Sequence, residues 1–232
     1  MSDLPQSVSG NRIDQTLAGE SRLEIGEVIS EAWQLTSGVK LLLFGGWIVF
    51  VLASMIIVSV LATVFGLDYL QGGGSQITQL IATILLYPFL TGVLMIGLKH
   101  SVGMPVSANE FLAHYGSILT IAAVGVLQSL AIGVGMVLLI LPGLYLSVAL
   151  SLAIPLHVEK QLGIIDSLVT SLKLINKHFL TVLLLLILAA VVLMASIVTI
   201  IGLIWSIPWM IMVFSIIYRQ LAGIEFADRP QG

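Results

Sequence analysis

The sequence predicts an all-α membrane protein in which six transmembrane helices form three hairpins, each preceded by an amphipathic interfacial helix. Hydrophobic residues make up 58% of the chain and charged residues 9%, whereas soluble domains carry roughly a quarter charged residues. Three long apolar runs cover most of the chain: Leu41–Leu98, Ile118–Val158 and Phe179–Tyr218. No Lys, Arg, Asp or Glu lies within any of the spans predicted in these runs, since Asp68 falls in a turn. A chain of this composition must expose much of its surface to lipid.

The charged residues predict an orientation. With the runs folded as hairpins, all nine Lys and Arg residues fall on one face of the membrane, and every acidic residue except Asp68 falls there too. Cytoplasmic loops carry an excess of Lys and Arg. We therefore expect a multi-pass protein of the bacterial inner membrane with both termini in the cytoplasm.

The amino-terminal part of the chain comes before the first predicted element. Residues 1–20 contain Asp3 and Asp14 and have no apolar core, so they do not resemble a signal peptide and are expected to be a disordered cytosolic tail. We expect one membrane domain over residues 21–226 and a short cytosolic tail at 227–232.

The first hairpin follows an amphipathic stretch, Ile25–Thr36, whose apolar residues recur at helical spacing as in a helix lying in the headgroup plane. Leu41–Phe65 is long enough to span, because the hydrocarbon core needs about 20 apolar residues. The glycine-rich stretch Gly66–Ser75 predicts a turn. Ile77–Leu98 is the second span, and Pro88 is expected to kink it.

The second hairpin is less regular. Ile118–Val158 is too long for one span, and we expect it to break at Pro142-Gly143 because proline lacks a donor and glycine permits a turn. The part after the break is shorter than the roughly 20 residues that a span needs. It is expected either to start inside the hydrocarbon or to lie in a thinned bilayer. Ser107–Tyr115 is a short amphipathic stretch before this hairpin.

The third hairpin, Phe179–Tyr218, is expected to turn around Gly202. The amphipathic stretch Ile164–Lys177 precedes it. Trp205, Trp209 and Tyr218 bracket its second helix and are interpreted as aromatic residues at the membrane interfaces.

Several kinds of chemistry are disfavoured. Spans without charge argue against an ion-coupled pump or a proton relay. The chain has no cysteine, no hydrolase motif and no phosphate-binding glycine loop. Its four histidines all map near the cytoplasmic boundary, where solvation explains them better than a shared metal does. We expect no catalytic residue, cofactor or metal, and no nucleic-acid partner.

Two polar residues within the second hairpin are candidate intramembrane contacts, Gln128 and Ser129. The amide of Gln128 would serve either as an interhelical hydrogen bond or as a substrate contact. Ser129 belongs to a small-residue stripe with Gly125 and Gly133, a pattern that lets another helix approach closely.

One stretch carries a resemblance to a family. Pro142-Gly143-Leu144-Tyr145 with the downstream Pro155, together with Ile25–Leu35, resembles the YciC-like bacterial inner-membrane proteins and the related membrane domain of glycerophosphoryl diester phosphodiesterases. The resemblance implies a six-helix membrane domain without settled activity, and marks Pro142, Gly143, Tyr145 and Pro155 as a candidate motif. Members often carry an arginine shortly after the tyrosine, and this chain has none there.

Three functions are compared. The first is a non-catalytic membrane protein that organises lipids or partner proteins, with membrane lipids, other membrane proteins or a second copy of itself as partners. The second is a transporter or channel for an uncharged or amphipathic solute or lipid, because broken helices mark transport sites. The third, an intramembrane lipid-processing enzyme, lacks a nucleophile–base pair. The first is the expected function.

Overall fold

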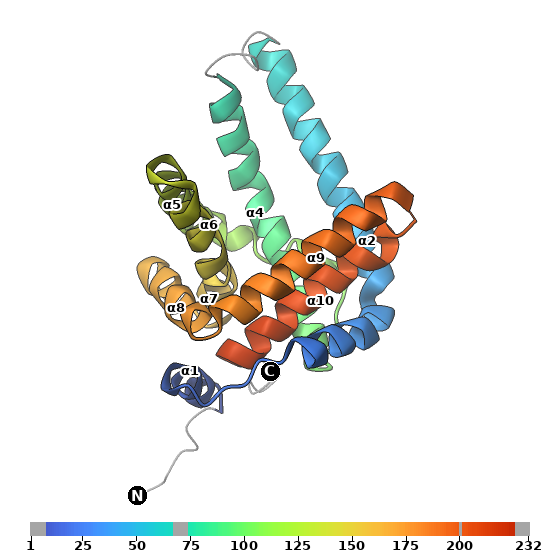
Figure 1. The fold of residues 1–232 in the computed structure, drawn as a ribbon. Helices are drawn as coiled ribbons and strands as arrows, with labels where there is room; N and C mark the ends of the chain where they lie inside the picture. The colour runs from blue at the N-terminus through green and yellow to red at the C-terminus, as the bar shows by residue number, and fades with distance from the viewer. Residues whose placement is uncertain (1–7, 67–73, 200, 226–232) are drawn as a thin grey trace, which may run out of the picture.

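The computed structural model describes residues 8–66, 74–199 and 201–225, with the backbone alone at 8–11 and 74–79, and these parts of the chain contain helices and turns but no strand (Figure 1). The elements are α1 (Val8–Ala18), α2 (Ile25–Phe65), α4 (Gly74–Ser101), the 3₁₀ turns η1 (Ala108–Phe111) and η2 (Tyr115–Ser117), α5 (Ile118–Leu138), α6 (Ile140–Ala149), α7 (Ala153–Glu159), α8 (Ile164–Lys177), α9 (Phe179–Thr199) and α10 (Leu203–Ala222). The predicted all-α class is confirmed.

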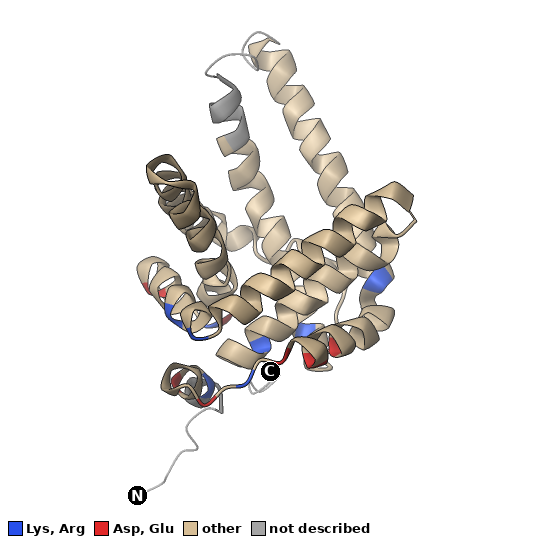
Figure 2. Ribbon diagram, viewed as in Figure 1, with Lys and Arg blue, Asp and Glu red and all other residues tan. Residues whose placement is uncertain are grey.

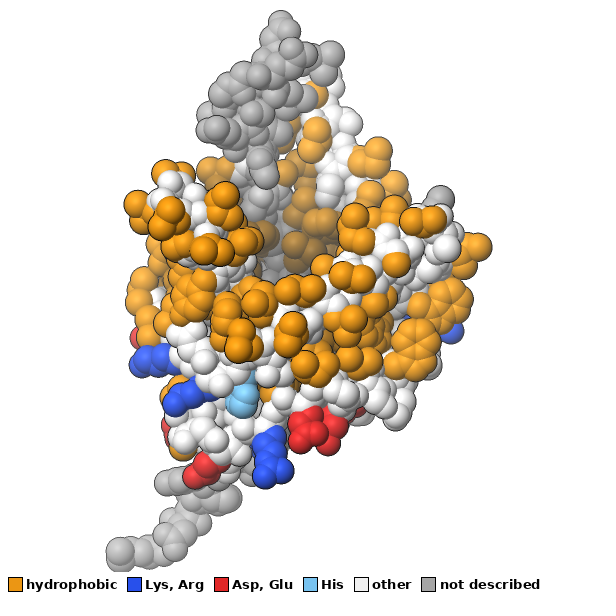
Figure 3. All heavy atoms as spheres, viewed as in Figure 1, with side chains coloured by type: hydrophobic (Ala, Val, Ile, Leu, Met, Phe, Trp, Pro, Cys, Tyr) orange, Lys and Arg blue, Asp and Glu red, His pale blue; other side chains and the backbone are white. Residues whose placement is uncertain are grey.

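Six helical segments in the described parts of the chain are long and apolar enough to cross a membrane. Their surfaces support this interpretation, because large apolar side chains cover the outside of the molecule (Figure 3). Val137 and Val198, for example, are 88% and 87% exposed. A soluble protein rarely exposes apolar surface on this scale, so the fold is that of a multi-pass membrane protein.

Helix α10 forms the centre of the bundle. Met212, Ile216 and Tyr218 on this helix are fully buried, and α10 packs against α2, α4 and α9. Most of the main hydrophobic cluster surrounds it, with contributions from α2, α4 and α9. The last helix of the chain therefore holds the first hairpin and the third together.

Helix α2 joins the predicted amphipathic stretch and the first span into one helix of 41 residues. At about 1.5 Å per residue this helix is roughly twice as long as a membrane is thick, and it bends between its lower and upper parts (Figure 1). The Thr36 hydroxyl donates to the Ala32 carbonyl at 2.7 Å, and Ser37-Gly38 follows. Such hydroxyl back-bonding and Gly/Ser pairs bend helices.

The amphipathic parts of α2 and α8 bury their apolar stripes against protein. Val28, Ala32 and Thr36 of α2 are buried, and Glu31 in the same part of α2 accepts hydrogen bonds from Arg219 of α10. Leu174 and Ile175 of α8 are buried in the same main cluster. The stripe that predicted an interfacial helix therefore serves largely as a packing face.

Two predicted segments differ from the structure. The expectation of disorder over residues 1–20 is wrong for α1, which is held to the end of α10 because Thr16 donates to the Leu221 carbonyl at 2.8 Å; residues 1–7 lie outside the described parts. The predicted helix at Ser107–Tyr115 is two 3₁₀ turns instead. Phe111 anchors the first turn by stacking on Phe89, with ring centroids 5.1 Å apart.

The turn of the third hairpin is confirmed at Gly202, between α9 and α10. The start of α10 lies beside α2, where the Lys40 ammonium sits 5.3 Å from the centre of the Trp205 ring. Trp209 and Tyr218 are buried at 4% and 0% exposure, so their interpretation as interface aromatics is wrong. They pack inside the bundle because α10 is its central helix. The predicted turn of the first hairpin falls mostly on residues 67–73, outside the described parts.

Candidate functional site: a polar end beneath apolar clefts

Most of the described charged residues gather at one end of the molecule, here called the charged end, where the ribbon is coloured blue and red (Figure 2). It comprises α1, the start of α2, the ends of α4, α7 and α10, and α8. Lys40 is the exception, since its ammonium lies beside Trp205 at the start of α10. Upper α2 and α4, α5 and α6 show neither blue nor red in that view (Figure 2). The predicted one-sided distribution of charge is therefore present for the described charged residues apart from Lys40.

A buried polar network lies at the charged end around Glu159 of α7. Its carboxylate is 0% exposed and accepts hydrogen bonds from the Tyr218 hydroxyl at 2.8 Å and from the Glu225 backbone N–H at 2.5 Å. The Lys160 ammonium lies 3.5 Å from the Glu159 carboxylate and 3.2 Å from that of Glu225. A buried charge needs such partners. The network joins α7 to the end of α10.

Arg219 of α10 joins three helices at the same end. Its Nη2 donates to both carboxylate oxygens of Glu31 on α2, at 2.6 and 2.7 Å. Its Nη1 donates to the carbonyl of Ser101, the last residue of α4. A guanidinium at a helix carboxyl terminus also meets the negative end of the helix dipole.

A polar pocket of about 520 Å³ opens next to the network, between α4, α5 and α7. We call it the charged-end pocket. Its four ionisable side chains come from three segments that meet only in the fold: Lys99 from α4, His114 from the turn before η2, and His157 and Glu159 from α7. The residues that line it are Met95, Lys99, His114, Ser117, Thr120, His157, Val158, Glu159 and Gln161.

Three of the four histidines make separate hydrogen bonds. His100 hydrogen-bonds the Leu35 carbonyl at 3.0 Å beside the α2 bend, and His157 Nδ1 the Leu162 carbonyl at 2.7 Å. His178 Nε2 lies 2.8 Å from the Ser21 hydroxyl, and partial burial lowers the pKa of this imidazole. The described residues hold no group of three or more side chains able to bind a metal.

The predicted break at Pro142-Gly143 is displaced. The chain turns at Leu139, whose backbone is extended, and Pro142 lies in the first turn of α6. Proline is tolerated there because the first helical N–H groups have no partner in the helix. Gly143 is the point of closest approach, since a Cβ there would lie 2.4 Å from Cγ of Met136. The motif therefore closes the α5–α6 hairpin.

Tyr145 and Pro155 lie apart from each other. The Tyr145 hydroxyl donates to Oδ1 of Asn176 at 2.7 Å, and its ring packs against Phe179. Pro155 is buried in α7. Pro142, Gly143 and Tyr145 therefore lie on α6 and Pro155 lies on α7. The four motif residues make separate packing contacts and do not form one site.

The true discontinuity of the predicted fourth span lies between α6 and α7. Ser171 of α8 is fully buried and fills this break. Its hydroxyl donates to the Ala149 carbonyl at 2.8 Å and accepts from the Leu152 N–H at 3.1 Å. Backbone groups freed in an apolar interior must find such partners. The break is therefore closed by protein.

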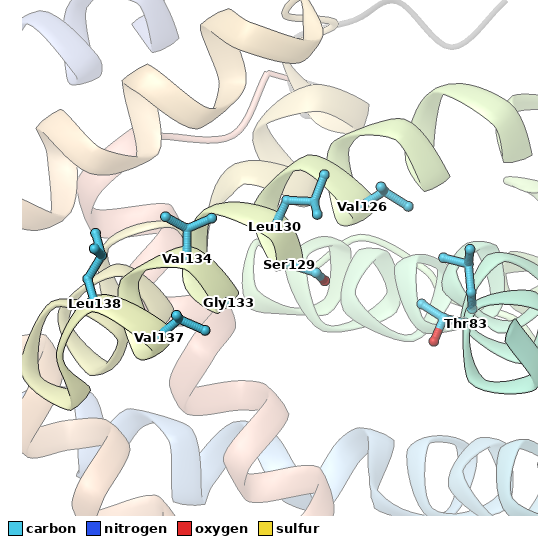
Figure 4. Close-up of a pocket in the computed structure, with 9 residues that line it drawn as sticks. Thr83, Val126, Ser129, Leu130, Gly133, Val134, Val137 and Leu138 are labelled. Carbon is cyan, nitrogen blue, oxygen red and sulfur yellow. The ribbon is translucent and has the colours of Figure 1, made fainter. Parts of the chain in front are cut away.

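The polar pair Gln128 and Ser129 is separated. The Gln128 side-chain oxygen is buried and accepts no hydrogen bond from the described residues. Ser129 faces a cleft of about 620 Å³ between α4 and α5, opposite Thr83 (Figure 4). We call it the α4–α5 cleft. Apart from these two hydroxyl residues, only apolar side chains and a glycine line it: Leu80, Val126, Leu130, Gly133, Val134, Val137 and Leu138.

The small-residue stripe explains the shape of this cleft. A Cβ at Gly125 would lie 1.7 Å from the Tyr87 ring, so α4 and α5 touch there. A Cβ at Gly133 would meet nothing within 4 Å. The prediction of close helix approach thus holds at Gly125 but is wrong at Gly133, because the helices diverge beyond the contact and leave the cleft.

A second apolar cleft of about 590 Å³ lies between the first hairpin and the third. Its lining includes Trp47 and Phe50 of α2, Leu90 of α4, Leu193 of α9 and Ile207 of α10. Figure 3 shows the apolar surface hollowed between the hairpins. The hairpins therefore leave apolar openings between them above the charged end.

The Glu159–Tyr218 contact could not be predicted from the sequence, because the two residues are 59 positions apart. One signal was present: Glu159-Lys160 is an ionisable pair directly after an apolar run.

Comparison with models of protein families, with curated proteins and with solved structures finds no match to this chain.

Proposed function

We propose that this chain is a non-catalytic protein of the bacterial inner membrane that organises membrane lipids, with the charged end and both termini in the cytoplasm. The observation that carries the proposal is the α4–α5 cleft. It is a large, mostly apolar space whose rim residues Leu130, Val137 and Leu138 are themselves exposed on the outer surface. An acyl chain fits such a space, because burying it there resembles leaving it in the bilayer.

The orientation rests on the distribution of charge. Eight of the nine basic residues lie in the described parts of the chain, and most of the blue stretches of the ribbon in Figure 2 lie at the charged end, with Lys40 beside Trp205 as the exception. The positive-inside rule assigns that end to the cytoplasm. The resemblance of the Pro142–Pro155 stretch to the YciC-like family supports the same membrane.

A lipid suits the clefts better than a polar solute does. The α4–α5 cleft offers two hydroxyl groups, from Thr83 and Ser129. A passage for solute through the α6–α7 break would need free backbone groups, and Ser171 already binds them. Transport of an uncharged or amphipathic solute stays the competing function, and the experiment below separates the two.

The test uses purified protein in lipid nanodiscs that contain a phospholipid with a photoreactive diazirine in its acyl chain. We expect cross-links concentrated on cleft residues such as Leu130 and Val134, above the level at Val198 of α9, which is more exposed. Cross-linking in proportion to exposure alone contradicts the proposal. Uptake of a neutral solute into proteoliposomes would favour the transporter, and a changed lipid composition would favour an enzyme.

A further inference from the structure

The charged-end pocket combines groups that suit a phosphate. Lys99 supplies a cation that pairs with Glu110 at 2.6 Å and remains about one quarter exposed. Ser117 supplies a hydroxyl group at the exposed start of α5, and the Thr120 hydroxyl, which donates to the Ser117 carbonyl at 3.0 Å, lies on the same lining. Ammonium and hydroxyl groups are the donors that proteins use for phosphate oxygens.

The second observation that points to a ligand is the state of the His114 imidazole. Its Nε2 atom is buried and has no hydrogen-bond partner among the described residues, although the side chain lines the pocket. Buried polar atoms nearly always have a partner. A ligand oxygen in the pocket would supply one, with the imidazole in the tautomer that carries its proton on Nε2.

The acidic residue of the pocket limits the ligand's charge. Glu159 is held by the Tyr218 hydroxyl, the Glu225 N–H and the Lys160 ammonium, so its charge is largely compensated. Lys99 is the single Lys or Arg among the described residues that line the pocket. Because Lys99 is itself paired with Glu110, the positive charge that the pocket offers is partly neutralised, which suits a group of low charge, such as a phosphodiester, rather than a polyanion.

The surroundings place the pocket beside an apolar surface. Leu119 lies between pocket residues along α5 and is 79% exposed, and Leu112 near the 3₁₀ turns is 66% exposed. Polar groups next to exposed leucines are the pattern expected where lipid headgroups meet acyl chains. Both ends of a phospholipid would find a matching surface here.

We propose that the charged-end pocket binds a phosphate group at Lys99 and His114, supplied by a lipid headgroup or by free phosphate. The lipid source rests on the proposed function above. The pocket is separate from the α4–α5 cleft, so the two can be tested independently.

The experiment measures binding by calorimetry to the full chain in maltoside micelles. The probes are dihexanoyl phosphatidylglycerol, dihexanoylglycerol without phosphate, and inorganic phosphate. We expect phosphatidylglycerol to bind at least about tenfold more tightly than dihexanoylglycerol. Lys99→Gln should weaken its binding about tenfold, since a hydrogen bond to a charged group is lost. Lys173→Gln removes an exposed charge from α8 and should leave binding unchanged.

His114→Phe is the second variant, because it breaks no hydrogen bond among the described residues. It should weaken binding about threefold or more. Equal affinity of the unmodified protein, Lys99→Gln and His114→Phe for phosphatidylglycerol overturns the proposal. Inorganic phosphate binding as tightly as the lipid, with the same loss in Lys99→Gln, assigns the site to free phosphate. If the unmodified protein does not bind phosphatidylglycerol but still gives acyl-chain cross-links in the α4–α5 cleft, this inference is overturned and the proposed function is not.

Discussion

The Tyr218 hydroxyl donates a hydrogen bond to the Glu159 carboxylate across 2.8 Å, and both side chains are almost completely buried. The contact joins the end of the fourth span to the end of the sixth. It ties the second hairpin to the central helix at the charged end, and the stability of the fold should depend on it.

Tyr218→Phe removes this hydrogen bond while keeping the ring. A hydrogen bond to a charged group contributes about 1.5–3 kcal/mol, so the free energy of unfolding should fall by that amount in a denaturant titration of the protein in micelles. Tyr145→Phe is the matched control, because its hydroxyl binds the neutral Asn176 in an exposed position. A loss for Tyr145→Phe as large as that for Tyr218→Phe would contradict the role of the network.

Ser171→Ala should loosen the break between α6 and α7. The variant leaves the Leu152 N–H and the Ala149 carbonyl without their partner, and each buried unsatisfied group costs about 1–3 kcal/mol. Hydrogen exchange of the Leu152 amide should accelerate. Ser167→Ala is the control, because that hydroxyl bonds the Ile164 carbonyl within its own helix. Unchanged exchange at Leu152 in Ser171→Ala would show that the break does not need the hydroxyl.

Acid should release the segment between α1 and α2. Burial lowers the pKa of His178, which contacts Ser21, so the unfolded chain binds a proton more readily than the folded one. The stabilisation from neutral His178 is complete above the unfolded pKa of about 6.5 and declines as the pH falls below it. Amide exchange around Ser21, corrected for its intrinsic pH dependence, should be faster at low pH. The same response in His178→Phe would contradict this assignment.

The absence of cysteine makes topology directly measurable, since any introduced cysteine is unique. Lys173→Cys on α8 should react with a membrane-impermeant maleimide only from the cytoplasmic side. Val64→Cys near the end of α2, which is 68% exposed, should react only from the periplasmic side. Labelling of both positions from one side would overturn the orientation.

Some features were readable from sequence because they depend on local properties. Span length and hydropathy placed α9 and α10, and Gly202 marked their turn. The break of the second hairpin was misplaced because Pro142 fits the first turn of a helix. Ser171 and Tyr218 could not be assigned, since their roles depend on which helix packs against them. The polar character of the charged end was predictable, but its pocket depends on α4, α5 and α7 meeting in the fold.

The lipid cleft is tested most directly at Gly133. This glycine lines the α4–α5 cleft and a Cβ added there meets nothing within 4 Å, so the side chain of Gly133→Trp starts in open space and is expected to occupy part of the cleft. Gly45→Trp on α2 is the matched control, because its Cβ also meets nothing within 4 Å and it does not line this cleft. The measurement is the yield of acyl-chain cross-links at Leu130 in nanodiscs. A yield reduced at least about tenfold by Gly133→Trp and unchanged by Gly45→Trp is predicted, taking a filled site to lose about 1.4 kcal/mol or more of binding. Equal yields in both variants would contradict the account.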